Sequence, residues 1–273
     1  MGRFVTAIVL ASALTSVTSD AGASDCTNVS TGLIPLMDLG TGTYKGMVGG
    51  LYGAGSNEPP AAHAANGLQA ASRVVPRSRT GAPSSTGRVV LISIGMSNTT
   101  MEFRAFQELV RNDGCVSPSL TVVDWRSRWR DGRRLGRSCQ RRMVGAGQAA
   151  EGHRCDPRAS AGRVGEGGES RRVDAGYAST MLNPEPYAYE SGFVVKRIIQ
   201  RQIAGQLPIQ PWLAWGPYLW ADGLVPRSDG LTWQCSDFNS DGTHPSASGR
   251  RKVAERLLEF FESDDTATRW FLR

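Results

Sequence analysis

Two short motifs hold side chains that could carry out nucleophilic catalysis. Ser97 belongs to Gly95-Met96-Ser97-Asn98, and His244 belongs to Asp241-Gly242-Thr243-His244-Pro245. An aspartate three residues before a histidine can fix the ring tautomer, so that the other ring nitrogen faces a nucleophile. The tetrapeptide taken alone favours a simpler role, in which Ser97 or Asn98 caps a helix. The presence of both motifs in one chain shifts the balance toward catalysis.

The histidine motif has one competing interpretation, a calcium-binding loop. Residues 237–242 match the first half of an EF-hand loop. The twelfth position of that loop is Ser248 rather than glutamate, and Pro245 lies inside it. Calcium binding is therefore disfavoured. The other two histidines, His63 in an alanine-rich stretch and His153 in an arginine-rich one, have no comparable setting.

The apolar pattern predicts the elements that position these motifs. The run Val89–Ile94 lies between Gly87 and Gly95 and predicts a buried parallel strand directly before Ser97. A helix that ends at residues 112–114 and a strand over residues 120–123 should follow, which begins a parallel α/β sheet. Further helices are expected up to Gly205 and over residues 248–262. The apolar residues that mark the three helices are Phe103, Phe106, Leu109 and Val110, then Phe193, Val194, Ile198, Ile199 and Ile203, and finally Val253, Leu257, Phe260 and Phe261.

The N-terminal residues predict export. Residues 1–23 combine an early Arg3, an apolar run over residues 4–17 and a small-residue cleavage pattern at 21–23, which is typical of a signal peptide. The protein is therefore expected to be secreted or periplasmic, without a transmembrane helix. A lipoprotein anchor at Cys26 is disfavoured by Asp25. Residues 24–86 are expected to form an irregular arm, and residues 87–273 the main domain.

The cysteines give no support to zinc-ribbon or thioredoxin-like chemistry, because none forms a CxxC pair. An exported protein can form one disulfide among its cysteines, and the pairing stays open. The five cysteines are Cys26, Cys115, Cys139, Cys155 and Cys235.

The positive charge of the chain is confined to one segment. The formal net charge is +6, but residues 125–172 hold 13 arginines and 5 acidic residues, which leaves 18 basic and 20 acidic residues elsewhere. One interpretation is an arginine-rich loop that binds a polyanion. The other is a segment translated out of frame, since tryptophan followed by a CGN arginine codon gives a glycine codon when the frame moves by one base. Resequencing the gene across this segment decides between them.

The order of the motifs, GxSN after a strand and DxxHP before the last helix, resembles the SGNH (GDSL-like) hydrolase superfamily. Residues 183–193 and 212–220 also look like an uncharacterised group of secreted bacterial members. The resemblance implies a three-layer α/β/α fold with a mostly parallel, flavodoxin-like sheet, and an ester or acyl hydrolase that needs no metal or organic cofactor. It further implies that Ser97 is the nucleophile, His244 the general base and Asp241 its orienting carboxylate. The N–H of Ser97 would supply part of the oxyanion hole, with Gly95 and Asn98 as candidate oxyanion or substrate contacts.

Two departures from the family pattern support an alternative, a catalytically inactive binding protein on the same fold. Met96 stands where the family usually has aspartate, and the glycine and asparagine that complete the oxyanion hole would fall within or beside residues 125–172.

The expected substrate is a small-molecule or glycan ester, with no nucleic acid partner. The aromatic residues of 211–220 could stack on an acetylated sugar, but core packing is the favoured expectation. The same expectation applies to Tyr187 and Tyr189, with Glu190 as a polar contact.

Overall fold

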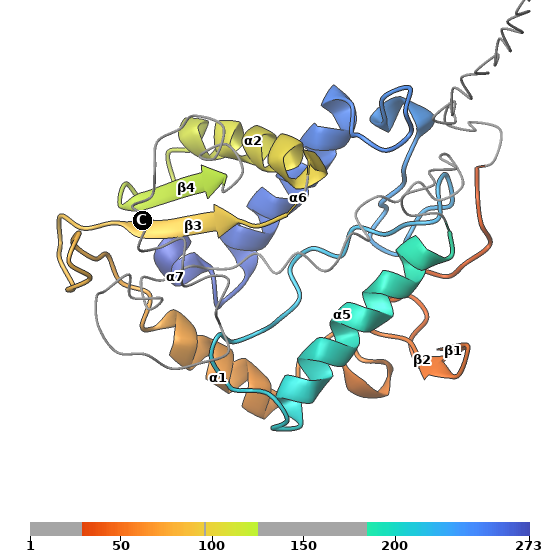
Figure 1. Ribbon diagram of the computed structural model, residues 1–273, viewed down its shortest axis with the longest axis horizontal. Coiled ribbons are helices and arrows are strands. Elements are labelled where there is room, and N and C mark those ends of the chain that lie inside the picture. Colours follow the sequence, from red (N-terminus) through yellow and green to blue (C-terminus); the bar gives the residue numbers. More distant parts are fainter. Residues whose placement is uncertain (1–28, 96, 125–184) are drawn as a thin grey trace, which may run out of the picture.

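The computed structural model describes residues 29–95, 97–124 and 185–273, a mixed α/β protein with one pair of parallel strands (Figure 1). Strand β3 (Val89–Ser93) pairs with β4 (Leu120–Asp124) in the register Val89↔Leu120 to Ser93↔Asp124. Val89, Leu91 and Ser93 are buried and the residues between them are half-buried, so both faces of β3 are at least partly covered. Helix α2 (Ser97–Asn112) forms the crossover that parallel strands require. The predicted strand pair and its helix are confirmed.

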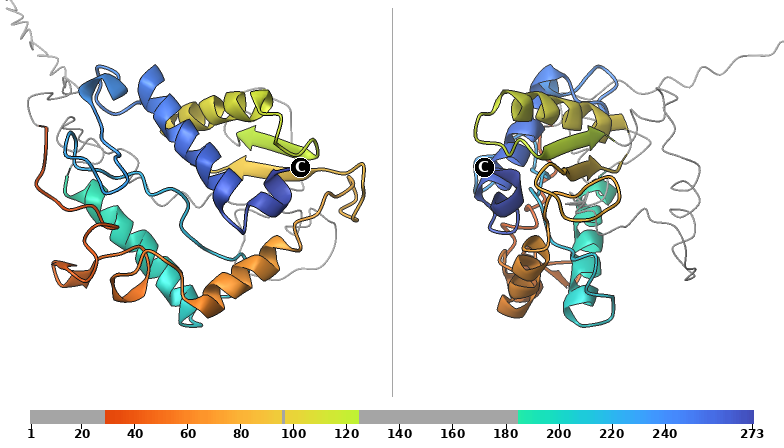
Figure 2. Two further views of the ribbon diagram at one scale, coloured as in Figure 1. Left: turned by 180° about the vertical axis from the view of Figure 1, so that it is seen from behind. Right: turned by 90° about the vertical axis from the view of Figure 1, so that its left-hand side faces the viewer.

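Helices α2 and α6 (Ala247–Ser263) pack against each other more extensively than any other two elements of the described residues. Seen from behind, α6 crosses the strands (Figure 2, left). The contact is aromatic, because the ring centroids of Phe106 and Phe261 lie 5.5 Å apart. Phe271 of the short helix α7 (Thr268–Phe271) stacks on Phe261 at 5.1 Å. This cluster fixes how the two helices lie against each other.

The helix ends follow the sequence signals. Helix α2 ends at Asn112 and α6 covers the expected range with one residue more at each end. Helix α5 (Tyr187–Ile203) ends before Gly205, which has φ of +72° and so takes the left-handed conformation that glycine tolerates. These predictions are confirmed.

The N-terminal residues, expected to form an irregular arm over residues 24–86, hold regular structure that the sequence analysis did not predict. Residues 29–86 hold helix α1 (Ala61–Ala71), the hairpin strands β1 (Thr43–Tyr44) and β2 (Met47–Val48), and a 3-10 turn, η1 (Gly53–Gly55). The alanine-rich helix has no stripe of large apolar residues that would reveal it. It packs through small residues instead, and a Cβ at Gly67 would overlap the ring of Trp212.

The N-terminal region is held by residues 185–231. The carboxylate of Asp222 accepts hydrogen bonds from the backbone N–H and hydroxyl of Thr31, at 2.6 and 2.7 Å, and from the N–H of Gly32 at 3.0 Å. Lys196 of α5 donates to the carbonyls of Val48 and Gly49, and burial lowers the pKa of this lysine. These bonds dock the hairpin region onto α5 and the loop after it.

The aromatic segment after α5 belongs mainly to the core, as favoured. Trp215, Tyr218 and Trp220 are buried, whereas Trp212 is half-buried against α1. Tyr189 is buried and burial raises its pKa to about 12. Tyr187 is exposed, so its core expectation is wrong. Glu190 accepts hydrogen bonds within the protein, from the Tyr44 hydroxyl at 2.9 Å and from Lys45 Nζ at 2.7 Å.

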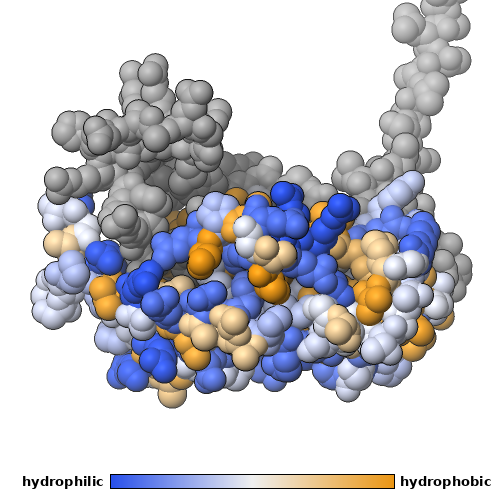
Figure 3. Space-filling view, turned by 90° about the horizontal axis from the view of Figure 1, so that it is seen from below, coloured by the Kyte–Doolittle hydropathy of each residue, from blue (hydrophilic) through white to orange (hydrophobic). Residues whose placement is uncertain are grey.

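The surface of the described residues is mixed in polarity. Seen from below, hydrophilic and hydrophobic residues alternate without one continuous apolar area (Figure 3). None of the helices in the described part combines the length and the apolar character that a membrane crossing needs. Cys235 is disulfide-bonded and Cys115 is a free, exposed thiol. The signal peptide, Cys26, Cys139, Cys155, His153 and the segment 125–172 lie outside the described residues.

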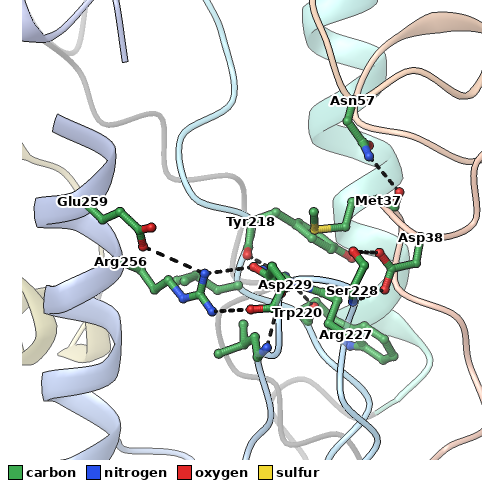
Figure 4. Close-up of polar contacts among 12 residues, drawn as sticks. Met37, Asp38, Asn57, Tyr218, Trp220, Arg227, Ser228, Asp229, Arg256 and Glu259 are labelled. Carbon is green, nitrogen blue, oxygen red and sulfur yellow. Dashed lines mark hydrogen bonds and ion pairs between the residues drawn. The ribbon is translucent and has the colours of Figure 1, made fainter. Parts of the chain in front are cut away.

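A buried arginine ties the loop after the aromatic segment to α6 (Figure 4). The guanidinium of Arg227 donates to the carbonyls of Tyr218 and Trp220, at 2.6 and 2.9 Å, and to both carboxylate oxygens of Asp229. Arg256 of α6 reaches the same carboxylate at 2.9 Å. The hydrogen bond from Arg227 lowers the pKa of Asp229 to about 2, although burial of the carboxylate acts in the opposite direction.

Asp229→Asn should lower the free energy of unfolding by about 1–2 kcal/mol at pH 7, because charge-assisted bonds to a buried guanidinium are weakened. Since the folded-state pKa is depressed, the contribution is present above the unfolded value of about 4 and is lost as the pH falls toward 2. Urea unfolding of both proteins between pH 3 and about pH 7 measures this. Glu259→Gln is the matched control, because Glu259 is exposed and reaches Arg256 only at 4.0 Å. A difference for Asp229→Asn that stays constant down to about pH 3 contradicts the assignment.

Candidate active site

Ser97 lies at the junction between a parallel strand and the helix that follows it. Strand β3 ends at Ser93, and Ser97 is the first residue of α2. The carboxyl ends of parallel strands are where α/β sheets place reactive groups. The first backbone N–H groups of a helix have no intrahelical acceptor and attract negative charge. The half-buried Ser97 therefore lies at a helix N-terminus, where backbone N–H groups can stabilise negative charge near its hydroxyl.

His244 connects Ser97 to Asp241. Its Nε2 lies 2.9 Å from Ser97 Oγ, and its Nδ1 lies 2.7 Å from Asp241 Oδ2. The structure thus brings the three candidate catalytic residues into one hydrogen-bonded chain, although Ser97 and His244 are 147 positions apart. With Nδ1–H donating to the carboxylate, Nε2 is free to accept the serine proton.

Hydrogen bonds within the turn itself hold Asp241 and His244 in place. Asp241 Oδ1 accepts from the N–H groups of Thr243 and His244, both at 2.9 Å, and Gly242 takes φ of +60°. The N–H of Asn239 donates to the His244 carbonyl at 2.8 Å, which closes the loop. The imidazole is therefore presented from a tight turn rather than from a long, free loop.

The start of α6 anchors this turn. The N–H of Ser246 donates to the Asp237 carbonyl at 2.8 Å, and the Ser246 hydroxyl caps the helix by accepting from the N–H of Gly249. A Cβ at position 249 would overlap the carbonyl oxygen of Asp237, so glycine is needed for this close approach. The turn that carries His244 is thus anchored to α6, the helix that packs on α2.

The electrostatics of the turn favour an ionised Asp241. Partial burial raises the pKa of Asp241, but the hydrogen bonds from the N–H and ring of His244 and from the N–H of Thr243 outweigh it, so the net shift is downward. A carboxylate that stays ionised can stabilise the imidazolium that forms when His244 accepts a proton.

The other two candidate residues are placed differently. Gly95 is exposed in the link between β3 and α2. The Asn98 side chain is buried, and its Nδ2 donates to the Thr243 carbonyl at 2.8 Å. In this arrangement its amide nitrogen faces the histidine turn. Met96, and the positions expected to supply the missing glycine and asparagine, lie outside the described residues.

The carboxylates of the calcium-like motif are engaged with other groups. Asp237 accepts from Lys252 Nζ at 2.5 Å and from the N–H of Gln234 at 2.9 Å, while Asp241 serves His244. Within residues 29–95, 97–124 and 185–273, no group of three or more histidine, cysteine, aspartate or glutamate side chains could hold a metal ion. The disfavoured calcium interpretation gains no support.

Sequence reasoning missed a buried carboxylate beside the site. Asp124, 3% exposed, ends β4 next to Ser93. Its Oδ1 lies 3.4 Å from the hydroxyl of Thr100 in the first turn of α2, and its Oδ2 lies 3.7 Å from Arg104. The signal for it was a carboxylate that directly follows the apolar strand residues Leu120–Val123.

Comparisons with family models, with curated proteins and with solved structures return no match to this chain.

Proposed function

We propose that this protein is a serine ester or acyl hydrolase of the SGNH type. One observation carries the proposal, the hydrogen-bonded chain Ser97–His244–Asp241 at the start of α2. A serine hydroxyl, an imidazole and a carboxylate in this order form the unit that activates serine in acyl-transfer enzymes. The resemblance of the two motifs to the superfamily agrees with the geometry.

The first half of the reaction forms an acyl-serine. Ser97 Oγ attacks the ester carbonyl carbon while His244 Nε2 takes the hydroxyl proton, and Asp241 stabilises the imidazolium. Negative charge develops on the carbonyl oxygen, and the N–H of Ser97 donates to it together with the field of the α2 N-terminus. The C–O bond to the alcohol then breaks, and the imidazolium gives its proton to the departing alkoxide.

The second half releases the acid. A water molecule takes the place of the alcohol, His244 removes its proton, and the resulting hydroxide adds to the acyl carbon. The bond to Ser97 Oγ breaks, Oγ recovers the proton from His244, and the carboxylic acid leaves. The free enzyme is restored without any redox partner.

The finer assignments belong to the same proposal. We assign the parallel β3–β4 pair with α2 and α6 to a three-layer α/β/α fold with a mostly parallel sheet. The substrate class is a small-molecule or glycan ester, with an acetylated carbohydrate as the leading candidate, and the protein acts outside the cytoplasm after removal of residues 1–23.

A fluorophosphonate probe tests the proposal, because it phosphonylates only an activated serine. The probe should label the purified protein at Ser97, as peptide mass spectrometry reads out, and labelling should stop in Ser97→Ala. Ser263→Ala is the matched control, since its hydroxyl lies near the end of α6 and donates to the Glu259 carbonyl. A folded protein that remains unlabelled favours an inactive binding protein on the same fold.

A further inference from the structure

We infer that Asn98 is a positioning residue of this hydrolase, whose side-chain amide holds the histidine turn at working distance from the nucleophile. The inference rests on the proposed function. It assigns Asn98 a role different from an oxyanion or substrate contact, because its donor group points at the protein backbone.

The bond joins the immediate neighbours of the two reacting residues. Asn98 follows the nucleophile Ser97, and Thr243 precedes the base His244. Asn98 Nδ2 donates to the Thr243 carbonyl at 2.8 Å across 145 positions of sequence. This bond and the Ser97–His244 bond both join the first turn of α2 to residues 241–244.

Of these two bonds, only the one from Asn98 can persist through the reaction. The Ser97–His244 bond must break, since the serine proton moves to His244 and Oγ becomes bonded to the acyl carbon. His244 then protonates the leaving group and later takes a proton from water. During these steps no hydrogen bond to the hydroxyl of Ser97 holds the ring. The Asn98–Thr243 bond involves no reacting atom and therefore keeps the turn in register throughout.

Burial makes the bond hard to replace. Asn98 is 4% exposed and Thr243 is 7% exposed, so water has little access to either partner. The Oδ1 atom of Asn98 is buried without a hydrogen-bond partner in the described part of the chain. An unpartnered buried acceptor is costly, and a leucine of similar size would avoid that cost. What leucine cannot supply is the donor to Thr243, which accounts for an amide at this position.

Asn98→Leu separates positioning from folding. The variant removes the donor and also removes the buried, unpartnered Oδ1, so the two effects on stability oppose each other. We expect kcat to fall by about 10- to 100-fold, because displacement of the base by about 1 Å costs this much, with KM within about twofold of wild type. Steady-state kinetics on a p-nitrophenyl ester, together with thermal unfolding, measure both quantities.

Gln107→Leu is the matched control. Gln107 lies on the same helix, and its Nε2 also donates to a backbone carbonyl at 2.8 Å, that of Val122. It is far along α2 from Ser97, so the substitution removes the same kind of bond without touching the turn. Its kcat should stay at the wild-type value. Equal losses of kcat in both variants, or an unchanged kcat in Asn98→Leu, overturn the inference.

Asn98→Asp provides a pH readout that a purely structural role does not produce. A carboxyl group buried against a carbonyl oxygen has a raised pKa, and its protonated form can donate to Thr243 while the ionised form cannot. The variant should therefore lose kcat relative to wild type as the pH rises through the raised pKa of this carboxyl, whereas wild type has no titrating group at position 98. A variant profile that rises in parallel with wild type contradicts the assignment.

Failure of the hydrolase proposal can be distinguished from failure of the positioning role of Asn98. If wild type neither turns over esters nor reacts with the fluorophosphonate, the hydrolase proposal fails. The ¹⁵N signals of the His244 ring then still report its hydrogen bonds without any turnover. Asn98→Leu should move the Nε2 signal, which senses Ser97, and leave the Nδ1 signal, which senses Asp241, near its wild-type position. An Nε2 signal that does not move removes the positioning role as well.

Discussion

Ser97→Ala should reduce kcat for ester hydrolysis by about 10⁶-fold, because loss of the nucleophile removes the acyl-enzyme route. The methyl group of alanine neither bonds to the acyl carbon nor donates to His244 Nε2, which lies 2.9 Å from the hydroxyl. Any residual rate over water would come from binding and from the N–H groups of the α2 N-terminus. Single-turnover and steady-state assays on an activated acetyl ester measure the loss.

The substitution should leave the fold intact. Ser97 is half-buried, and its hydroxyl makes the bond to His244. Thermal unfolding within about 2 °C of wild type is the control for folding. A second control is the double variant Ser97→Ala with His244→Ala, which should be no slower than Ser97→Ala, because residues of one catalytic unit are not additive. Ester turnover that survives Ser97→Ala would falsify the mechanism.

Asp241→Asn should reduce kcat by about 10⁴-fold through the tautomer of His244. The asparagine oxygen can still accept from the N–H groups of Thr243 and His244, so the turn is retained. The atom facing His244 Nδ1, at 2.7 Å in the wild type, then becomes an amide donor. The proton of the ring must therefore sit on Nε2, which can no longer accept from Ser97. The pH profile of kcat, together with ring ¹⁵N shifts, measures the change.

Asp241→Ala is the informative comparison. It removes the bonds to both backbone N–H groups as well as the ring contact, so it should disturb the turn and lower stability, whereas Asp241→Asn should not. If both variants lose stability equally, the loss of activity in Asp241→Asn reports unfolding of the turn. If Asp241→Asn keeps wild-type kcat, His244 does not depend on this carboxylate for its orientation.

The part of the fold nearest the site could be predicted because its signals are local. The β-branched run before Ser97 is fully consistent with a buried strand, and phenylalanines at helical spacing marked α2 and α6. A carboxylate three residues before a histidine needs only one turn to reach it. For these reasons β3, β4, α2, α6 and the Asp241–His244 pair could be predicted from the sequence.

The remaining features depend on contacts between distant residues. Helix α1 packs Gly67 under Trp212, and no pattern within the alanine-rich stretch reveals that partner. Asn98 looked like a helix cap or an oxyanion contact, and only its placement beside Thr243 shows where its donor goes. Hydrogen bonds from a side chain to a distant backbone carbonyl leave no trace in periodicity or composition.

The attachment of the N-terminal region to residues 185–231 has a consequence for biosynthesis. Thr31 and Asp222 are 191 positions apart, and Tyr189, Lys196 and Trp215 reach back in the same way to residues 34–51. At about 5–20 residues per second, a ribosome synthesises Asp222 roughly 10 to 40 seconds after Thr31. Leu36 and Tyr52, both buried in the finished protein, stay without their core for that interval. Residues 31–52 are thus made well before the residues on which they pack, and a chain interrupted before residue 185 presents these apolar side chains to chaperones and proteases.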